Sequence, residues 1–231
     1  MADNRTIELG GRAVALVVRR SKRARRLALR IPGHDDSVEL VLPMRAPEAD
    51  GLAFLRSRSS WVLDRLDRLP PRVPFADGAE LPLGGVPHRL RWHPGDGPPV
   101  AIDGHDILVA GRQEHMARRF RDWLHTEARR RITPLARDKA AMIAAPVTRI
   151  TIRDQKSRWG SCAPGGRLSF NWRLVLAPPP VLDYVVAHEV AHLSEPNHSP
   201  AFWRLVDRLT EGRETGRDWL RRHGPQLHRY G

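Results

Sequence analysis

The chain has 231 residues, with 39 Lys or Arg against 26 Asp or Glu, and therefore a formal net charge of +13. This length can bury one good core, or the core of a catalytic domain with a smaller appendage. Its apolar runs are too short to cross a bilayer, and its single cysteine, Cys162, excludes an internal disulfide. Because no signal-peptide pattern opens the sequence, we expect a cytoplasmic protein that does not associate with membranes.

The excess of positive charge bears on partners rather than on the fold. A charge of this size attracts nucleic acid and other polyanions. The alternative is a solvated basic face without a partner, which is common for surface charge. Nucleic acid, bound through a basic surface, is therefore a candidate partner that the sequence alone does not decide.

The first part of the chain is predicted to be rich in β-structure. Residues 14–18 and 27–31 read as two strands, and the segment Arg19–Arg26 between them predicts a strongly basic hairpin. Val38–Leu42 predicts a third strand. Leucine and valine then recur at helical spacing from Leu52 to Leu69, and a pair of prolines ends this pattern.

The middle of the chain predicts two more short strands, near Leu81–Leu83 and Ile107–Val109, with a Pro/Gly-rich loop at Pro94–Pro99 between them. The character of the sequence changes at about residue 111. We place a soft boundary there, between a β-rich N-terminal region with the basic hairpin, residues 1–111, and a catalytic domain, residues 112–231.

The second region opens with a long basic helix, whose apolar stripe runs over Met116–Leu124. This helix is predicted to break at Pro134, where Thr133 can cap the next helix. Residues 148–152 and 168–174 read as strands joined by a Pro/Gly turn. Strands and helices in this order predict an α+β fold.

The segment Val181–Leu193 is a strong helix candidate that follows three prolines. His188 and His192 are four residues apart, so both imidazoles leave the same helix face and can bind one metal ion. Glu189 follows the first histidine and can reach a water near that ion without being a ligand. This is the H-E-x-x-H arrangement of zinc hydrolases.

A third candidate ligand, His198, follows six residues after the second histidine. Pro196 disfavours helix continuation, and Ser199 with Pro200 predicts the start of the next helix, so the chain reverses there. Three protein ligands with an open fourth position are typical of catalytic zinc. Two alternatives stay open: the helix histidines are satisfied core residues, or Glu195 or a later carboxylate is the third ligand.

Five segments together resemble the YgjP-like metal-dependent hydrolases, small zincins related to the SprT and WLM peptidases: Lys156–Cys162, Leu168–Leu174, His188–His192, His198–Ser199 and Phe202–Trp203. The basic segment from Arg19 to Arg30 extends the resemblance upstream. The resemblance implies a zincin-like catalytic domain, with zinc on His188, His192 and His198 and with Glu189 as the catalytic residue. It also implies that residues 168–174 form the sheet edge along which an extended substrate lies.

The chemistry expected is hydrolysis in which Glu189 acts as general base on a water that zinc acidifies. Arg158, Asn171 and Tyr184 are candidate donors for the developing oxyanion. We expect a zinc-dependent metallopeptidase that acts on proteins or peptides, including proteins associated with nucleic acid. Two alternatives are a zinc hydrolase of a small substrate, such as a nucleotide phosphoanhydride, and a non-catalytic nucleic-acid-binding module with structural zinc.

Overall fold

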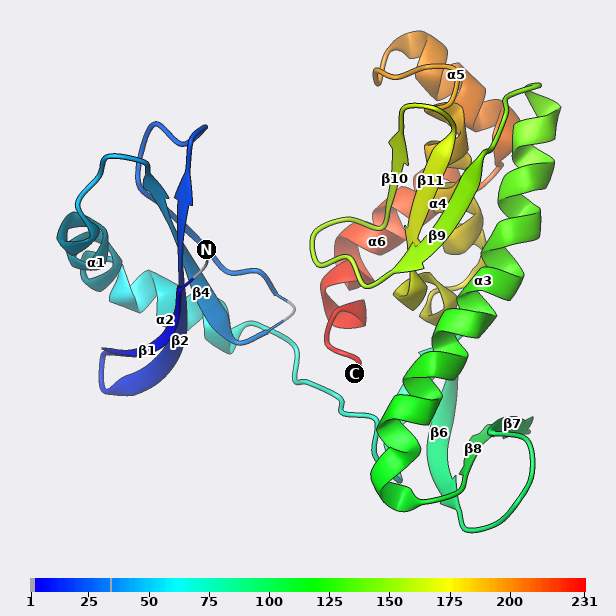
Figure 1. Cartoon of the computed structure of the whole chain (residues 1–231), viewed down its shortest axis with the longest axis horizontal. Helices are drawn as coiled ribbons and strands as arrows, with labels where there is room; N and C mark the ends of the chain where they lie inside the picture. Colours follow the sequence, from blue (N-terminus) through cyan, green and yellow to red (C-terminus); the bar gives the residue numbers. More distant parts are fainter. Residues whose placement is uncertain (1–2, 34) are drawn as a thin grey trace. The chain divides into compact units, whose positions relative to one another are not determined.

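The computed structural model of the chain describes residues 3–33 and 35–231. The chain divides into two compact units, Met1–Pro71 and Arg72–Gly231, which are coloured blue to cyan and cyan to red in Figure 1. The described residues form six α-helices and three mixed sheets, which confirms the predicted α+β class. Among these residues, no helix is both long and apolar enough to span a membrane.

The first unit is a four-stranded sheet followed by two helices. The strands lie in the order β1-β2-β4-β3, and the elements are β1 (Asp3–Leu9), β2 (Arg12–Ser21), β3 (Ala28–Arg30), β4 (Ser37–Pro43), α1 (Glu48–Ser57) and α2 (Ser59–Asp67). The predicted helical stretch is therefore two helices that meet at Arg58. Sequence patterns did not reveal β1, which pairs with β2 through a turn at Gly10 and Gly11, both with positive φ.

The predicted basic hairpin is wrong, because β2 and β3 do not pair. β4 lies between them, parallel to β2 and antiparallel to β3. The physical reason is burial. Val38, Leu40 and Leu42 of β4 are fully buried, and a central position in the sheet gives this strand neighbours on both sides. The segment Arg19–Arg26 therefore contains the end of β2 and the loop after it.

The second unit contains two sheets and four helices. Its elements are β5 (Glu80–Leu83), β6 (Val86–His93), β7 (Val100–Asp103), β8 (Asp106–Ala110), α3 (Met116–Met142), β9 (Arg149–Arg153), β10 (Gly160–Ala163), β11 (Arg167–Asn171), α4 (Pro179–Ala191), α5 (Pro200–Leu209) and α6 (Arg213–Leu227). The first sheet has the order β5-β6-β8-β7, and the second has the order β10-β11-β9.

The structure divides the chain at Pro71 rather than near residue 111. Leu90 of β6 and Ile107 of β8 are fully buried in the same core as Phe120 and Leu124 of α3. The sheet β5-β6-β8-β7 therefore belongs to the unit that carries the histidines. The change in sequence character near residue 111 marks the approach to α3, an element boundary inside this unit.

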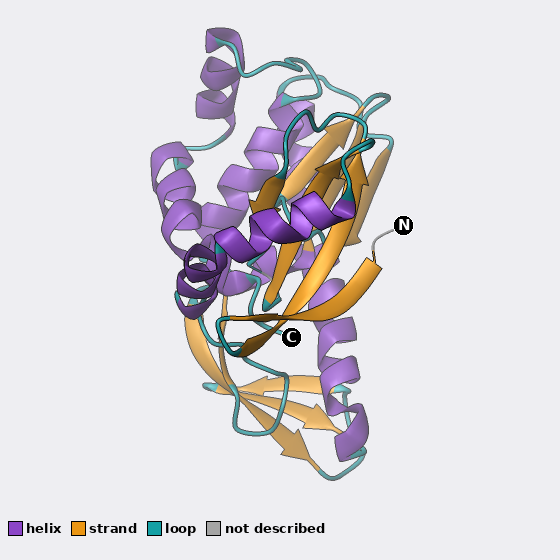
Figure 2. Ribbon diagram, turned by 90° about the vertical axis from the view of Figure 1, so that its left-hand side faces the viewer, coloured by secondary structure: helices purple, strands orange, loops and turns teal. Residues whose placement is uncertain are grey.

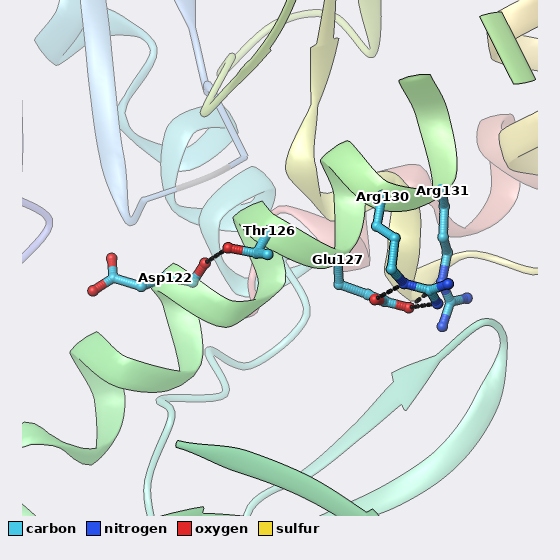
Figure 3. Close-up of polar contacts among 5 residues, drawn as sticks. All are labelled: Asp122, Thr126, Glu127, Arg130 and Arg131. Atoms are coloured by element: carbon cyan, nitrogen blue, oxygen red, sulfur yellow. Dashed lines mark hydrogen bonds and ion pairs between the residues drawn. The ribbon is translucent and has the colours of Figure 1, made fainter. Parts of the chain in front are cut away.

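The predicted break at Pro134 is also wrong, because α3 continues through this residue. Proline lacks the N–H that would donate to the carbonyl four residues earlier, which weakens a helix. Packing outweighs this loss, because Ile132 and Ala136 on either side are fully buried. Figure 3 shows a further local stabilisation, in which the carboxylate of Glu127 accepts hydrogen bonds from the guanidinium groups of Arg130 and Arg131.

The second sheet of this unit places β11 in the centre, so the implied edge strand at residues 168–174 is wrong. β11 ends at Asn171, and Trp172–Leu176 form a 3₁₀ helix. The strand pairs with β9 on one side and with β10 on the other, and β10 is an edge strand. One face of this sheet packs on α4, which lies behind the strands in Figure 1; Figure 2 shows the strands and helices from another side.

Candidate metal centre

Helix α4 carries the first part of the site. It begins at Pro179, as the proline run predicts, and most of its residues are buried, so it is a core helix rather than a surface helix. His188 is partly buried and Glu189 is 7% exposed. The helix ends at Ala191, which leaves His192 at the C-cap position.

The chain then reverses and returns to α4. Ser199 is the N-cap of α5, and its hydroxyl accepts a hydrogen bond from the Phe202 N–H at 3.3 Å. Pro200 is the first residue of that helix. His198 immediately precedes the cap, and its position is therefore set by the start of α5.

The three predicted histidines come together. One nitrogen from each of His188, His192 and His198 lies within 4.8 Å of the others, and the Nε2 atoms of His188 and His198 are 3.2 Å apart. A zinc ion bound tetrahedrally at about 2.0–2.1 Å from each nitrogen separates two ligand nitrogens by about 3.4 Å. The spacing in this cluster therefore suits an ion of that size.

The side chain of Glu195 is outside this group, although it was an alternative third ligand. Its backbone carbonyl instead lies 3.0 Å from His192 Nδ1. Because a carbonyl can only accept, Nδ1 of His192 must carry the proton. The Nε2 lone pair is then left free for a metal, which is the usual role of such an outer hydrogen bond.

Two aromatic residues of α5 position the imidazoles. The ring of Phe202 is fully buried, with its centroid 5.0 Å from that of His188, 4.5 Å from that of His192 and 4.8 Å from that of His198. Trp203 stacks on His198 at 5.6 Å. Periodicity in the sequence cannot show which neighbours a buried ring contacts, so this role of Phe202 comes from the structure alone.

The electrostatics of the cluster suit metal binding. Burial, with a smaller contribution from His192 and His198, lowers the pKa of His188 to about 4. His188 is therefore neutral at neutral pH and keeps a lone pair for a metal. Its Nδ1 atom is buried without a hydrogen-bond partner among the described residues. A set of three imidazole nitrogens favours zinc and related ions over the oxygen-binding Ca²⁺ and Mg²⁺.

Glu189 is held between α4 and the edge strand β10. A Cβ atom added to Gly160 would lie 2.5 Å from Glu189 Cγ, so only glycine fits beside this side chain. The Cys162 N–H hydrogen-bonds the carboxylate. Burial raises the pKa of Glu189 to about 7, against the opposing effects of Arg158 and of this hydrogen bond. A nearby dication would lower it and favour the carboxylate form.

Gly160 and the backbone of Cys162 are site positions that residue chemistry did not reveal. Their contribution comes from a missing side chain and from a backbone N–H, and neither has a chemical signature in the sequence. Only the resemblance of the whole segment Lys156–Cys162 to a family motif pointed to this strand.

The three candidate oxyanion donors differ in their surroundings. Both ends of the fully buried Asn171 amide are used, since Nδ2 donates to the Gln155 carbonyl at 2.6 Å and Oδ1 accepts from the Arg173 N–H at 3.0 Å. Tyr184 is buried beside His188, with 6.0 Å between ring centroids. Arg158 is exposed, and its charge acts on Glu189. Asn171 therefore has a structural role, whereas no hydrogen bond or ion pair engages Arg158 among the residues that the structure describes.

A pocket of about 420 Å³ adjoins the cluster. It lies between the end of β10 with its following turn and the chain just after α4. Its lining consists of Cys162, Ala163, Pro164, Gly165, Gly166, His192, Leu193 and Pro196. The pocket therefore connects the edge strand with a candidate metal ligand through mainly apolar walls.

Comparison with known protein families gives one match. A family model described as YgjP-like, metallopeptidase domain, matches residues 25–223. This range spans most of the chain and includes the three histidines, Glu189 and β10. Comparisons with curated proteins and with solved structures returned no match.

Proposed function

The chain belongs to the YgjP-like metallopeptidase family, and we propose that it is a zinc-dependent peptidase of the H-E-x-x-H type. In this proposal His188, His192 and His198 bind one zinc ion, and Glu189 is the general base. The observation that carries it is the convergence of three imidazole nitrogens within 4.8 Å, one of them from His188 of α4, the helix that also carries the buried carboxylate of Glu189. The three-histidine set leaves a fourth position for substrate or water, as catalytic zinc requires.

The chemistry follows from these groups. A zinc ion held here would supply Lewis acidity, which lowers the pKa of water to about 7 and polarises a carbonyl oxygen. Glu189 accepts the proton of the attacking water on its carboxylate and later donates it to the leaving amide nitrogen. Gly160 and the Cys162 N–H hold this carboxylate in place, so it does not have to reorganise during the reaction.

We propose that the substrate lies in an extended conformation along β10. This strand is the edge of its sheet, and its first residue, Gly160, contacts Glu189. An edge strand offers unpaired backbone groups that bind an extended peptide without reading its side chains. The adjoining pocket of about 420 Å³ then accepts one apolar side chain of the substrate. A nucleotide phosphoanhydride would use neither feature.

The nucleic-acid part of the proposal rests on the loop after β2. Lys22, Arg23, Arg25 and Arg26 are exposed, and no ion pair to any of them is found within the described part of the chain. The two preceding arginines have partners within the chain. Arg19 forms an ion pair with Glu39 at 2.6 Å, and Arg20 donates hydrogen bonds to backbone carbonyls. We propose that these four cations contact phosphates, which would bring the peptidase to proteins associated with nucleic acid.

The experiment that tests the peptidase proposal compares zinc-loaded wild type with Glu189→Gln on casein and on a mixture of unfolded peptides. The amide keeps size and polarity but cannot accept a proton at neutral pH. Turnover should fall by about 100-fold to 10,000-fold, while zinc content and melting temperature stay the same. Glu195→Gln is the matched control, because its side chain lies outside the histidine group, and this variant should keep its activity.

Full hydrolytic activity of zinc-loaded Glu189→Gln would show that Glu189 is not the general base. Loss of zinc in that variant would instead give Glu189 a structural role and contradict its assignment as base.

A further inference from the structure

The sheet β10-β11-β9 has a second face that the metal centre does not use. Side chains alternate between the faces of a strand, and Leu168 and Phe170 of β11 point into the core. Residues that alternate with the core positions of each strand share the other face, and they are Arg149, Thr151, Arg153, Ser161, Arg167 and Ser169. Gly160 and Cys162, which contact Glu189, alternate with Ser161. This outer face is therefore separate from the metal centre.

A pocket of about 290 Å³ lies on the outer face and is lined by donors of hydrogen bonds. Three arginines, Arg149, Arg153 and Arg167, line it together with Thr151, Gln155, Ser161 and Ser169, and its lining contains no carboxylate and no aromatic ring. Within the residues that the structure describes, no ion pair engages any of these three arginines. Their charge is therefore not neutralised by the chain itself.

The strand register places two of these arginines side by side on the outer face. Arg149 of β9 is the direct partner of Arg167 in β11, and neighbouring strands are about 4.8 Å apart. Like charges directly opposite each other on one face of a sheet are destabilising. A bound anion would remove this repulsion, whereas a solvated surface would leave it in place.

Two uncharged groups that line the same pocket also lack partners within the described residues. Ser169 Oγ is buried without a hydrogen bond, and so is Gln155 Oε1, while Gln155 Nε2 is 3.5 Å from Ser161 Oγ. A buried hydroxyl without a partner is costly, and it can donate to an anionic oxygen. The pocket therefore combines guanidinium charge with hydroxyl donors, which is the chemistry of a phosphate site.

We propose that the outer face of the sheet β10-β11-β9 binds the phosphate backbone of duplex nucleic acid without reading the bases. Arginine, serine, threonine and glutamine are residues that contact backbone phosphates. Arg149 and Arg153 are four residues apart, which is about 13 Å along a strand. This distance exceeds the spacing of adjacent phosphates, so the two arginines would contact different phosphates of the backbone. The pocket offers no aromatic ring for stacking, which disfavours a single strand as the ligand. This binding does not depend on zinc or on Glu189.

The test measures binding of the full chain to a fluorescent 20-base-pair duplex by anisotropy at increasing NaCl. Arg149→Gln/Arg167→Gln is compared with Arg118→Gln/Arg221→Gln, which changes the net charge equally at exposed positions of α3 and α6. The first pair should lower the slope of log affinity against log salt by about 2 and weaken binding more than tenfold, whereas the control pair should change binding less than twofold. Ser169→Ala should weaken binding severalfold with an unchanged slope, because it removes a donor and no charge.

Two further measurements distinguish a loss of phosphate binding from a loss of folding. Pyrophosphate at millimolar concentration should displace the duplex and raise the melting temperature of the wild type, but not that of Arg149→Gln/Arg167→Gln. That variant should melt no lower than the wild type and should keep its zinc. Equal losses in the two charge pairs, no effect of Ser169→Ala, or tighter binding of a phosphopeptide or single strand than of the duplex would overturn the proposal.

Discussion

At the residue scale, the position of Glu189 depends on the small size of Gly160, the residue of β10 that contacts it. Gly160 has no Cβ, and an added one would lie 2.5 Å from Glu189 Cγ and 2.7 Å from Oε1. Because Gly160 does not have a positive φ, alanine fits its backbone and tests the space alone. The catalytic geometry of the proposed base is therefore sensitive to a single methyl group on the opposite element.

We expect Gly160→Ala to keep its zinc but to lose on the order of 100-fold in turnover, because displacement of a catalytic group by about 1 Å has an effect of this size. Overpacking should also lower the free energy of unfolding by about 1–3 kcal/mol. Peptide hydrolysis and chemical denaturation measure the two effects. Gly212→Ala is the control, since its added Cβ would meet its nearest atom at 3.4 Å, an ordinary contact. An equally small effect of both changes would show that Glu189 can move without consequence.

The least buried of the three proposed ligands is His198. It is exposed and is oriented by Trp203, whereas His188 is enclosed by α4 and α5. The cap at Ser199 fixes the backbone that carries it. Its contribution to metal affinity can therefore be tested without disturbing the core.

We expect His198→Ala to weaken zinc binding by more than about 100-fold, because a ligand matters more than the outer hydrogen-bonding groups whose loss costs about 10–100-fold. His188→Ala and His192→Ala should lose zinc as well. Competition with a chromophoric chelator gives the affinities, and His223→Ala, outside the cluster, serves as the reference. Unchanged affinity in His198→Ala would mean that another group completes the site.

At the element scale, the order of strands decides which surface is available. β10 is at the edge beside Glu189, whereas β11 is paired on both sides and cannot add a peptide strand. In the first unit, β4 occupies the place between β2 and β3, so the cations after β2 lie in a loop rather than in a rigid hairpin. The availability of the β10 edge and of the loop after β2 therefore follows from pairings between segments distant in the sequence.

The cations of this loop should contribute to salt-dependent binding of nucleic acid. Arg25→Gln/Arg26→Gln should lower the slope of log affinity against log salt by about 2, because each neutralised phosphate contributes about 0.9. The control Arg12→Gln/Arg68→Gln removes the same charge from arginines that pair with Asp67 and Asp64, and should lower the slope by less than 1. If the two pairs behave alike, the loop is only a solvated surface.

At the scale of the whole molecule, the first and last residues of the second unit are joined by backbone hydrogen bonds. The Val73 N–H donates to the Arg229 carbonyl at 3.0 Å, and the Gly231 N–H donates to the Val73 carbonyl at 3.0 Å. Residues directly after Pro71 thus pair with the C-terminal end of the chain. The sheet β5-β6-β8-β7 lies within this unit and supplies apolar side chains to the core under α3.

We expect a fragment of residues 72–231 to unfold cooperatively and to bind zinc, and a fragment of residues 112–231 to do neither. The shorter fragment lacks the buried side chains of Leu81, Leu90 and Ile107, among others. Each large buried residue contributes about 2–5 kcal/mol, so the loss exceeds the usual stability of a domain, about 5–15 kcal/mol. Thermal unfolding followed by circular dichroism decides the question. Cooperative unfolding of the fragment 112–231 would show that this region folds independently and would support a domain boundary near residue 111.

The sequence by itself determined the features that depend on neighbouring residues. The spacing of His188 and His192 on one helical turn, the turn at Pro196 and the cap at Ser199 together predict three histidines near one another, and the structure brings these three together. These signals act within one or two helical turns, where periodicity and capping rules are strong. Their binding of zinc and the role of Glu189 stay predictions.

The tertiary structure alone decided what depends on contacts between distant segments. The insertion of β4 between β2 and β3, the central place of β11, and the fit of Gly160 against Glu189 join residues far apart in the chain. Pro134 stays inside α3 because buried neighbours outweigh its local effect. Hydrophobic burial is nondirectional and sums over all such contacts, so local patterns cannot show which strand pairs with which.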